Sequence, residues 1–269
     1  GIGRPRMTAV AIIGGGKMGE ALLAGLLGAN HSVVVCEPDE LRAASLRKKY
    51  GISTGDPRIA VENSDVVLLA VKPAMVGEVL GSVGDAIPVE ALVISVAAGI
   101  TTAALESGVA HGIGVVRAMP TTPALVGQGM TVLSAGRSCT PEQLEQAQEL
   151  LAAVGKVAVV PEAQQDAVTA LSGSGPAYVF FVVEAMIDAA IALGLDSETA
   201  RELAIQTAYG AATMLRETGD DPVELRENVT SPGGTTAAAL ERLEAHEVRE
   251  AFIAALTAAK LRSAELASE

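Results

Sequence analysis

A chain of 269 residues, 49% of them apolar, is long enough to form two domains, each with its own core. Its formal net charge of −13, with no run of more than three Lys or Arg, argues against nucleic-acid binding because an acidic surface repels phosphate backbones. Cys36 and Cys139 have neither metal-binding nor redox spacing, which favours a reducing, cytoplasmic compartment. The N-terminus, where Gly1–Arg6 precede Met7, lacks the pattern of a signal peptide.

Strand and helix patterns alternate over the first 160 residues. This alternation is typical of βαβ units and a largely parallel sheet, so residues 1–160 are predicted to form a Rossmann-like α/β domain. Apolar runs rich in β-branched residues predict strands at Ala9–Ile13, Ser32–Cys36, Val66–Ala70, Leu92–Val96, Ile113–Arg117, Thr131–Ser134 and Val157–Val160. Helical spacing predicts helices at Lys17–Leu27, Glu40–Tyr50, Met75–Val83 and Glu142–Val154.

Helix signals dominate after Pro161, so residues 161–269 are predicted to form an all-α domain. Cap residues set the expected bounds: Gly194 and Gly219 follow helices, and Asp221 opens a capping box with Pro at the next position. The predicted helices are Pro176–Leu193, a second that begins after Asp196 or Ser197 and ends near Gly219, one after Asp221, Thr236–Ala245 and Glu247–Leu266.

The most apolar segment of the chain, Ala177–Leu195, belongs to this second half. Glu184 and Asp188 interrupt it, which favours a buried helix over a membrane span, and no membrane partner is expected. The long apolar helices exceed what so small a domain needs for its own core. We therefore expect them to pack against a second subunit.

A glycine-rich turn follows the first predicted strand. Gly14, Gly16 and Gly19 form a G-x-G-x-x-G pattern between a strand and a helix. In such a turn the first glycine permits the bend, the second lets a pyrophosphate approach, and the third brings helix and strand together. The motif alone is weak evidence, since it also occurs as a structural glycine turn. Its context, at the first strand–helix connection, favours dinucleotide binding.

Further candidates lie where other predicted strands end. Glu37 follows the second strand, where an acidic side chain binds a ribose 2′-hydroxyl and repels a 2′-phosphate; Arg42 is the nearest arginine. This favours NADH, unless Glu37 points to solvent. Lys72 is placed to meet a phosphate, ribose or carboxylate, or is a solvated loop lysine. The three loops at strand ends are Ala70–Pro73, Val96–Gly99 and Arg117–Pro120.

Two segments of the second half combine hydroxyl groups with glycines. They are Leu171–Tyr178 and Val229–Ala237, and each precedes a predicted helix. A turn of this kind exposes backbone N–H groups that can bind an anion such as a substrate carboxylate.

Together with the N-terminal motifs, these segments make the chain resemble pyrroline-5-carboxylate reductase. The motifs IIGGGKMGEAL, LLAVKP, VISVAAGIT, RAMPTTPALVGQGMT, DAVTALSGSGPAY and LRENVTSPGGTTAAALERLE occur in the family's order and span nearly the whole chain. The resemblance implies reduction of 1-pyrroline-5-carboxylate to L-proline by NADPH or NADH, the last step of proline biosynthesis. It also implies a helical dimerisation domain, homodimers that often assemble into decamers, and an active site between the Rossmann and helical domains.

The resemblance also assigns residues. Ser231, Gly234, Thr235 and Thr236 would hold the substrate carboxylate, and the Thr236 hydroxyl would hydrogen-bond the ring nitrogen. The sequence departs from the family at Thr121, where Asn is usual, and at Glu37, since the family commonly uses NADPH. Contacts to the dinucleotide are implied for Ile13, Gly14, Gly15, Gly16, Lys17, Met18, Ala70, Val71, Lys72, Pro73, Val96, Ala97 and Ala98.

Two other functions fit the same architecture less well. A β-hydroxyacid dehydrogenase needs a catalytic lysine on a helix of its second domain, but no lysine occurs between Pro161 and Ala259. A dinucleotide sensor without catalytic activity would need no carboxylate-binding loop, so the SPGGTT segment argues against it. The histidines, His31, His111 and His246, lie outside every motif and are expected at the surface.

Overall fold

The structure is a computed structural model that describes residues 7–268; Gly1–Arg6 and Glu269 lie outside the described residues. The chain divides into a sheet unit, Gly1–Ser174 with Ala259–Glu269, and a helical unit, Gly175–Ala258. This division differs from the predicted boundary at residue 160. Hydrogen bonds explain the difference: the Gln165 amide donates to Ser134 Oγ at 2.8 Å, and the Ser263 hydroxyl donates to Asp166 at 2.7 Å.

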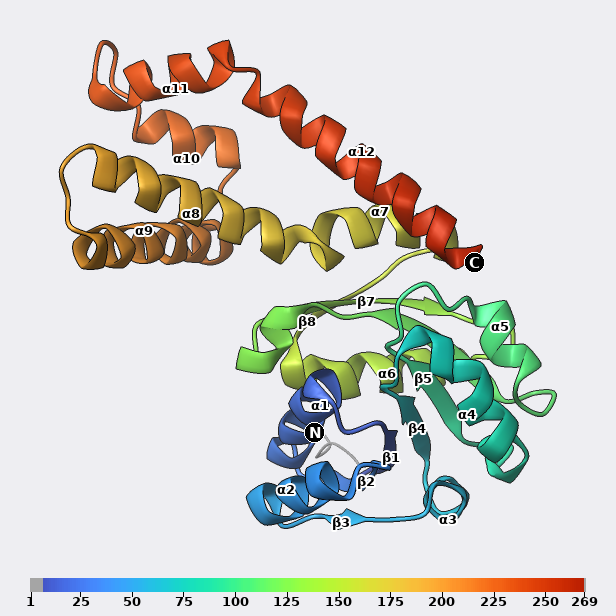
Figure 1. Cartoon of the computed structure of the whole chain (residues 1–269). Helices are drawn as coiled ribbons and strands as arrows, with labels where there is room; N and C mark the ends of the chain where they lie inside the picture. The colour runs from blue at the N-terminus through green and yellow to red at the C-terminus, as the bar shows by residue number, and fades with distance from the viewer. Residues whose placement is uncertain (1–6, 269) are drawn as a thin grey trace, which may run out of the picture. The chain divides into compact units, whose positions relative to one another are not determined.

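The sheet unit contains one sheet of eight strands in the order β3-β2-β1-β4-β5-β6-β7-β8 (Figure 1). Neighbouring strands are parallel except β6 and β7, which are antiparallel. Because β1 lies between β2 and β4, the order reverses at β1, where open α/β sheets bind ligands. The strands are β1 Ala9–Ile13, β2 Ser32–Cys36, β3 Ser53–Thr54, β4 Val66–Leu69, β5 Leu92–Ser95, β6 Gly114–Met119, β7 Gly129–Ala135 and β8 Gly155–Val159.

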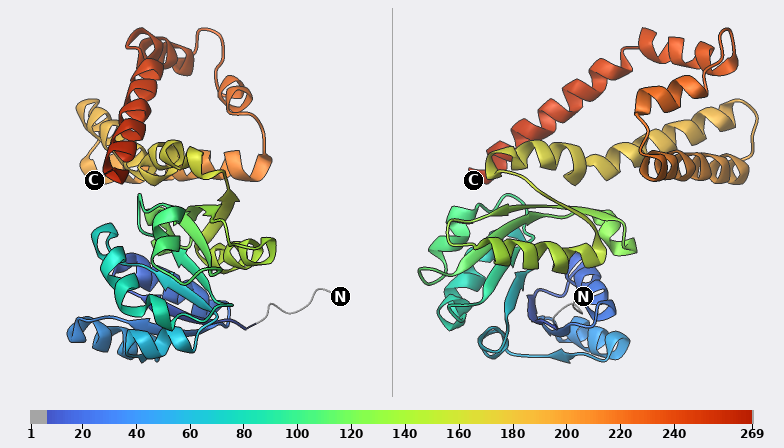
Figure 2. Two further views of the ribbon diagram at one scale, coloured as in Figure 1. Left: turned by 90° about the vertical axis from the view of Figure 1, so that its right-hand side faces the viewer. Right: turned by 180° about the vertical axis from the view of Figure 1, so that it is seen from behind.

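Helices cover both faces of this sheet, as Figure 2 shows from two further directions. One core contains Leu22, Leu46 and Leu150 from the first face, and the other contains Val61, Leu80 and Leu105 from the second. These leucines and valines lie on helix faces that meet alternate side chains of the strands. The first face carries α1 Lys17–Gly28, α2 Glu40–Tyr50 and α6 Pro141–Leu151; the second carries α3 Pro57–Glu62, α4 Val76–Val83 and α5 Thr102–Ser107.

The short elements β3, α3 and α5 were not predicted from the sequence. Each is too short for a periodic apolar pattern to be recognised over its own length. Local capping signals were nevertheless present: the Asp56 carboxylate accepts from the amides of Arg58 and Ile59, and the Thr101 hydroxyl accepts from the amide of Ala104. Strand β3 is a two-residue edge strand that pairs with Val34 and Val35.

The helical unit follows the predicted caps closely. The Asp196 carboxylate caps α9, and Gly219 ends that helix in the left-handed conformation at φ 69°. Asp221 caps α10 as predicted, although its carboxylate accepts from the amide of Val223 instead of forming the full capping box. The helices here are α8 Gly175–Ala192, α9 Ser197–Thr218, α10 Pro222–Asn228 and α11 Thr235–Ala245; α12, Val248–Ala267, begins in this unit.

One predicted turn is wrong. The segment Leu171–Tyr178 is not a bend with exposed N–H groups, because helix α7, Gln165–Val168, continues through a π-helical turn, Thr169–Gly173, to α8. The Ser174 amide donates to the Thr169 carbonyl at 2.8 Å. A proline ring clashes with the carbonyl four residues before it, and the wider π turn ahead of Pro176 changes that spacing. The segment therefore offers no loop for an anion.

The prediction of a buried α8 is also wrong for the chain by itself. No residue of α8 is buried, and Phe180 and Phe181 are 65% and 70% exposed. Residues Glu162–Ala192 form a helical stretch long and apolar enough to cross a membrane by composition alone, a test that helices of soluble proteins also pass. Only Ala200 and Ala204 of the helical unit are buried, so this unit leaves a large apolar surface open.

Candidate functional site

The turn between β1 and α1 has the conformation that a phosphate-binding turn requires. Gly14 has φ 107°, and a Cβ atom there would overlap the Ala70 carbonyl of the neighbouring strand end. Gly19 approaches the Gly14 carbonyl equally closely. By contrast, a Cβ atom on Gly16 would meet nothing within 4 Å. Gly14 and Gly19 are therefore required by close packing, and Gly16 keeps one side of the turn open for a ligand.

A cavity of about 570 Å³ opens beside this turn. Glu37, at the end of β2, and Lys72, after β4, both line it together with the glycine turn after β1, so residues from three strand ends border one space. The cavity is closed on its other sides by Gly55 and Pro57 and by Met75 and Val79. Of the predicted dinucleotide contacts, it brings together Ile13, Gly14, Gly15, Gly16, Glu37, Ala70, Val71 and Lys72.

The other predicted contacts lie nearby but do not line this cavity. Lys17 and Met18 form the first turn of α1, and Pro73 begins a 3₁₀ turn, Pro73–Met75. The Val96 amide donates to the Leu69 carbonyl at 3.0 Å, which places the loop containing Val96, Ala97 and Ala98 beside the end of β4. All of these loops are at the carboxyl edge of neighbouring parallel strands, as predicted for a ligand site of an open sheet.

Eight helix N-termini of the described residues fall into two groups; α4 and α7 also lack a side-chain cap, but they do not begin at a glycine. Two helices, α1 and α11, begin at a glycine, Gly16 or Gly234, that offers no side-chain cap. Their first N–H groups can therefore bind an external anion, which the partial positive charge of a helix N-terminus also favours. In six other helices a side chain already occupies this position, through Asp39, Asp56, Thr101, Thr140, Asp196 and Asp221.

The loop before α11 contains the predicted carboxylate-binding residues. Gly233 has φ 69°, a conformation that favours glycine, and the Gly234 amide donates to the Ser231 carbonyl at 3.0 Å. This tight bend brings Ser231 next to Gly234 at the start of the helix. Thr235 and Thr236 form the first positions of α11; Thr235 is exposed and Thr236 is half-buried. Hydroxyls and N–H groups are thus gathered at one helix end.

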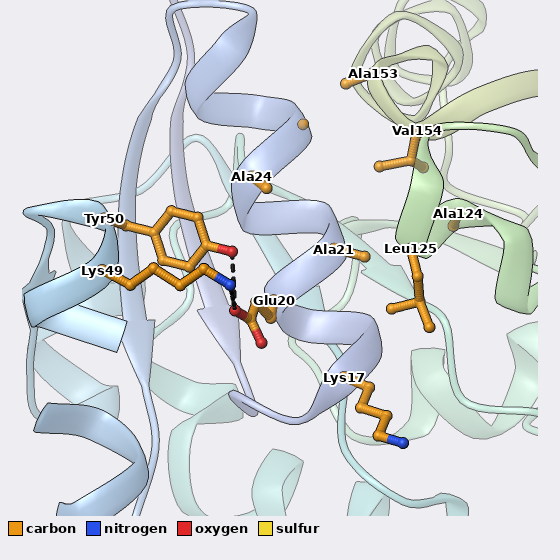
Figure 3. A pocket seen from close by; sticks show the side chains of 12 residues that line it. Lys17, Glu20, Ala21, Ala24, Lys49, Tyr50, Ala124, Leu125, Ala153 and Val154 are labelled. Atoms are coloured by element: carbon orange, nitrogen blue, oxygen red, sulfur yellow. Dashed lines mark hydrogen bonds and ion pairs between the residues drawn. The ribbon is translucent and has the colours of Figure 1, made fainter. Parts of the chain in front are cut away.

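A polar cluster behind the phosphate-binding turn was missed in the sequence. The Glu20 carboxylate of α1 accepts from Arg42 at 2.7 Å, Lys49 at 3.0 Å and Tyr50 at 2.9 Å, all three from α2. Figure 3 shows Glu20 facing Lys49 and Tyr50 between these helices. The hydrogen bonds, that from Arg42 foremost, lower the pKa of Glu20 from 4.5 to about 2. In the sequence, Arg42 stood out only as the arginine nearest to Glu37, which does not indicate its contact with Glu20.

The structure also shows the surroundings of Thr121 and of the two cysteines. The hydroxyl of Thr121, where the family usually has Asn, accepts from the Met130 amide at 2.9 Å and is buried. Cys36 and Cys139 are both free thiols, and burial raises the pKa of Cys36 to about 11. Within residues 7–268, no group of three His, Cys, Asp or Glu side chains could hold a metal ion.

Comparison with known proteins matches two family models to separate parts of the chain, and relatives of one named family to nearly all of it. The family model described as pyrroline-5-carboxylate reductase dimerisation matches residues 162–266, and that described as NADP oxidoreductase, coenzyme F420-dependent, matches residues 9–99. A pyrroline-5-carboxylate reductase of Corynebacterium melassecola is 47% identical over 97% of this chain and 99% of its own length.

Solved structures agree with this match. The structure of a pyrroline-5-carboxylate reductase from Coxiella burnetii is 41% identical, with a TM-score of 0.93 over 97% of this chain and 99% of that one. The NADP-bound pyrroline carboxylate reductase of Plasmodium falciparum is 28% identical, with a TM-score of 0.84 over 96% of this chain and 98% of that one. Identity and coverage of this extent show that the chain belongs to the pyrroline-5-carboxylate reductase family.

Proposed function

We propose that this chain reduces 1-pyrroline-5-carboxylate to L-proline with a nicotinamide dinucleotide as the hydride donor. The observation that supports this most directly is the pair of uncapped glycine N-termini, at Gly16 and Gly234, in a member of the pyrroline-5-carboxylate reductase family. One such N-terminus suits the pyrophosphate of the dinucleotide and the other suits the carboxylate of the substrate. The experiment is the oxidation of NADH or NADPH on addition of 1-pyrroline-5-carboxylate, followed at the dinucleotide's absorbance.

The cavity beside β1 fits a dinucleotide. Its volume of about 570 Å³, its mostly apolar wall and the open N–H groups at Gly16 match what an adenosine and a pyrophosphate require. We assign the pyrophosphate to Gly14, Gly15 and Gly16, and the further contacts to Lys72 and the loop Val96–Ala98. When bound, the dinucleotide supplies the hydride for the reduction.

The reaction requires little acid–base catalysis by the protein. One hydride adds to the carbon of the C=N bond and one proton is retained on or added to the nitrogen, which leaves the secondary amine of proline. Positioning of the two reactants can account for about 7–11 kcal/mol of the barrier. We assign the substrate carboxylate to Ser231, Gly234, Thr235 and Thr236. The Thr236 hydroxyl, a weak acid, orients the ring nitrogen through a hydrogen bond.

Thr236→Ala tests this assignment. Loss of a hydrogen bond to a charged ring nitrogen is expected to lower kcat about 10- to 100-fold and to leave the Kd for the dinucleotide unchanged. Thr236→Ser keeps the hydroxyl and should retain most of the activity. Thr257→Ala, which removes a hydroxyl bonded to the Ile253 carbonyl within α12, is the matched control. Wild-type turnover in Thr236→Ala would overturn the role of the hydroxyl.

Gly16→Asp tests the dinucleotide site separately. Because an added Cβ atom at Gly16 meets no atom within 4 Å, we expect the variant to fold, with its carboxylate close to the pyrophosphate. We expect dinucleotide binding to fall at least about 100-fold, and Gly16→Ala to lose much less. Undiminished binding in Gly16→Asp, measured by fluorescence titration with NADH, would refute this location of the site.

We also propose that NADH is preferred over NADPH. Glu37 lines the cavity at the end of β2, where a carboxylate can accept hydrogen bonds from the ribose hydroxyls and repel a 2′-phosphate. Arg42, the nearest arginine, is already bonded to Gly15 and Glu20. Steady-state reduction with both dinucleotides, in the wild type and in Glu37→Gln, tests this: the preference for NADH should shrink in the variant.

The assembly that we propose is a homodimer formed through the helical unit, with further assembly of dimers into decamers. The dimerisation family match and the exposed apolar side chains of α8 support the first step. Light scattering of the 27.2 kDa chain distinguishes one, two and ten copies. A cytoplasmic location is proposed on the two free thiols, and fractionation of the source cells tests it.

A further inference from the structure

We propose that Arg42, held in place by Glu20, is a positioning residue that orients the phosphate-binding turn for the dinucleotide. This inference rests on the proposed function, because it concerns the same dinucleotide site. Neither residue lines the cavity at the end of the strands, so both would act through the backbone of the turn.

The first step of the argument is a contact between a side chain and the backbone. The Arg42 Nε–H donates to the Gly15 carbonyl at 2.6 Å, and a terminal N–H of the same guanidinium approaches the Gly16 carbonyl at 3.4 Å. One planar cation thus contacts the two successive carbonyls of the turn. A guanidinium suits this task because its donors are fixed in one plane.

The second step follows from the planar trans peptide. The C=O of one residue and the N–H of the next point in opposite directions, so a carbonyl that is held on one side fixes the amide on the other. With the Gly15 carbonyl held by Arg42 of α2, the Gly16 N–H points away from α2. Within the described residues, the Gly16 N–H forms no hydrogen bond. It is therefore free for a pyrophosphate oxygen.

The third step is what holds Arg42 itself. Its guanidinium donates to the Glu20 carboxylate at 2.7 Å, and both side chains are less than one-third exposed. Lys49 and Tyr50 donate to the other oxygen of Glu20, so the carboxylate is fixed from both sides. The pKa of Glu20, lowered to about 2, keeps this carboxylate charged throughout the pH range of a working enzyme. The Arg42 side chain is thereby ordered before any ligand arrives.

The same helix contains a matched arginine that does not touch the turn. Arg47 of α2 donates to Glu40 and to Thr54, both at 2.6 Å. It therefore forms an equivalent ion pair and side-chain hydrogen bond without a contact to Gly15 or Gly16. Loss of Arg47 should affect the stability of α2 as loss of Arg42 does, but it should not affect the turn.

The experiment measures binding and turnover for Arg42→Met, Glu20→Gln and the control Arg47→Met. We expect Arg42→Met to raise the Kd for NADH about tenfold and that for NADPH by a similar factor, because both share the pyrophosphate. Glu20→Gln should raise both about threefold, and Arg47→Met less than twofold. At saturating dinucleotide and 1-pyrroline-5-carboxylate, kcat should stay within about twofold of wild type, and Arg42→Lys should restore part of the affinity.

Several outcomes would overturn the proposal. One is a Kd in Arg42→Met within twofold of wild type. Another is an equal loss in Arg47→Met, which would mark a general effect on α2. A loss confined to NADPH would show that Arg42 binds the 2′-phosphate instead of ordering the turn. Failure of the wild type to bind either dinucleotide would instead overturn the proposed function, so the two failures are distinguishable.

Discussion

The sheet unit and the helical unit differ in how far their apolar side chains are buried. In the sheet unit, strands and flanking helices bury side chains on both faces, and Leu68 and Ile94 are 0% exposed. In the helical unit, α8 buries no residue, although most of its side chains are apolar. A layer of helices on each side of a sheet completes its own core, whereas a few long helices have no second layer to pack against.

The buried side chains of the sheet unit should therefore govern the stability of the single chain, and the exposed ones of the helical unit its assembly. Side chains of the sheet unit stabilise the single chain, since they leave water when that unit folds. Burial of the large apolar side chains of the helical unit would stabilise a complex with another molecule. The match to a dimerisation family indicates that this molecule is a second copy. The predictions below test this separation.

The largest expected effect comes from the core of the sheet unit. Leu68→Ala removes a fully buried side chain of β4 and should lower the free energy of unfolding by about 2–5 kcal/mol, through lost burial and a cavity. Urea denaturation followed by circular dichroism measures this. Val89→Ala, at a position 66% exposed in the same unit, should cost less than about 0.5 kcal/mol. Equal losses in free energy of unfolding for the two variants would contradict the expected difference between buried and exposed positions.

A charge in the apolar surface of the helical unit should act on assembly instead. Phe181→Glu places a carboxylate where the side chain is 70% exposed in the single chain, and burial against a partner would leave that charge unpaired. We expect the dimer to dissociate at least about 100-fold more readily, near 2.7 kcal/mol. Sedimentation of Leu41→Glu, at a position 85% exposed in the sheet unit, provides the control and should show no change in mass.

Charged side chains should show the same contrast, with a dependence on pH. The folded-state pKa of Glu20, about 2, lies below its ordinary value of 4.5, so its contribution to stability is complete above pH 4.5 and is lost as the pH falls toward 2. Glu20→Gln should therefore destabilise the chain by about 1 kcal/mol at pH 7, and the difference from wild type should vanish near pH 2. In the helical unit, Glu244→Gln removes an exposed ion pair with Arg249 and should change little at either pH.

The smallest effect is expected at a glycine of the helical unit. Gly210 lies inside α9, and an added Cβ atom would meet nothing within 4 Å in the single chain. Gly210→Ala should raise stability by about 0.5–1 kcal/mol, because glycine is a poor helix former. Thermal unfolding at several concentrations checks this. If the variant is less stable only where the chain assembles, Gly210 packs against a partner.

Local features were predictable from the sequence because their causes lie within a few neighbouring residues. The strands β1 and β2, helix α2 and the caps at Asp196, Gly219 and Asp221 all follow from patterns and end signals in the chain. The glycine turn was predictable for the same reason, since Gly14, Gly16 and Gly19 each have a separate geometric role. Family motifs extended these local predictions to the reaction.

The arrangement of residues distant in sequence was decided only by the tertiary structure. The contact of Arg42 with Gly15, 27 positions away, depends on how α2 packs beside α1, and no periodicity encodes it. The sequence of the segment before Pro176 predicts a turn, yet the helix continues through it because a π turn accommodates the proline. The exposure of α8 likewise depends on what packs against it: the sequence determined that the helix is apolar, but burial is a property of the surroundings.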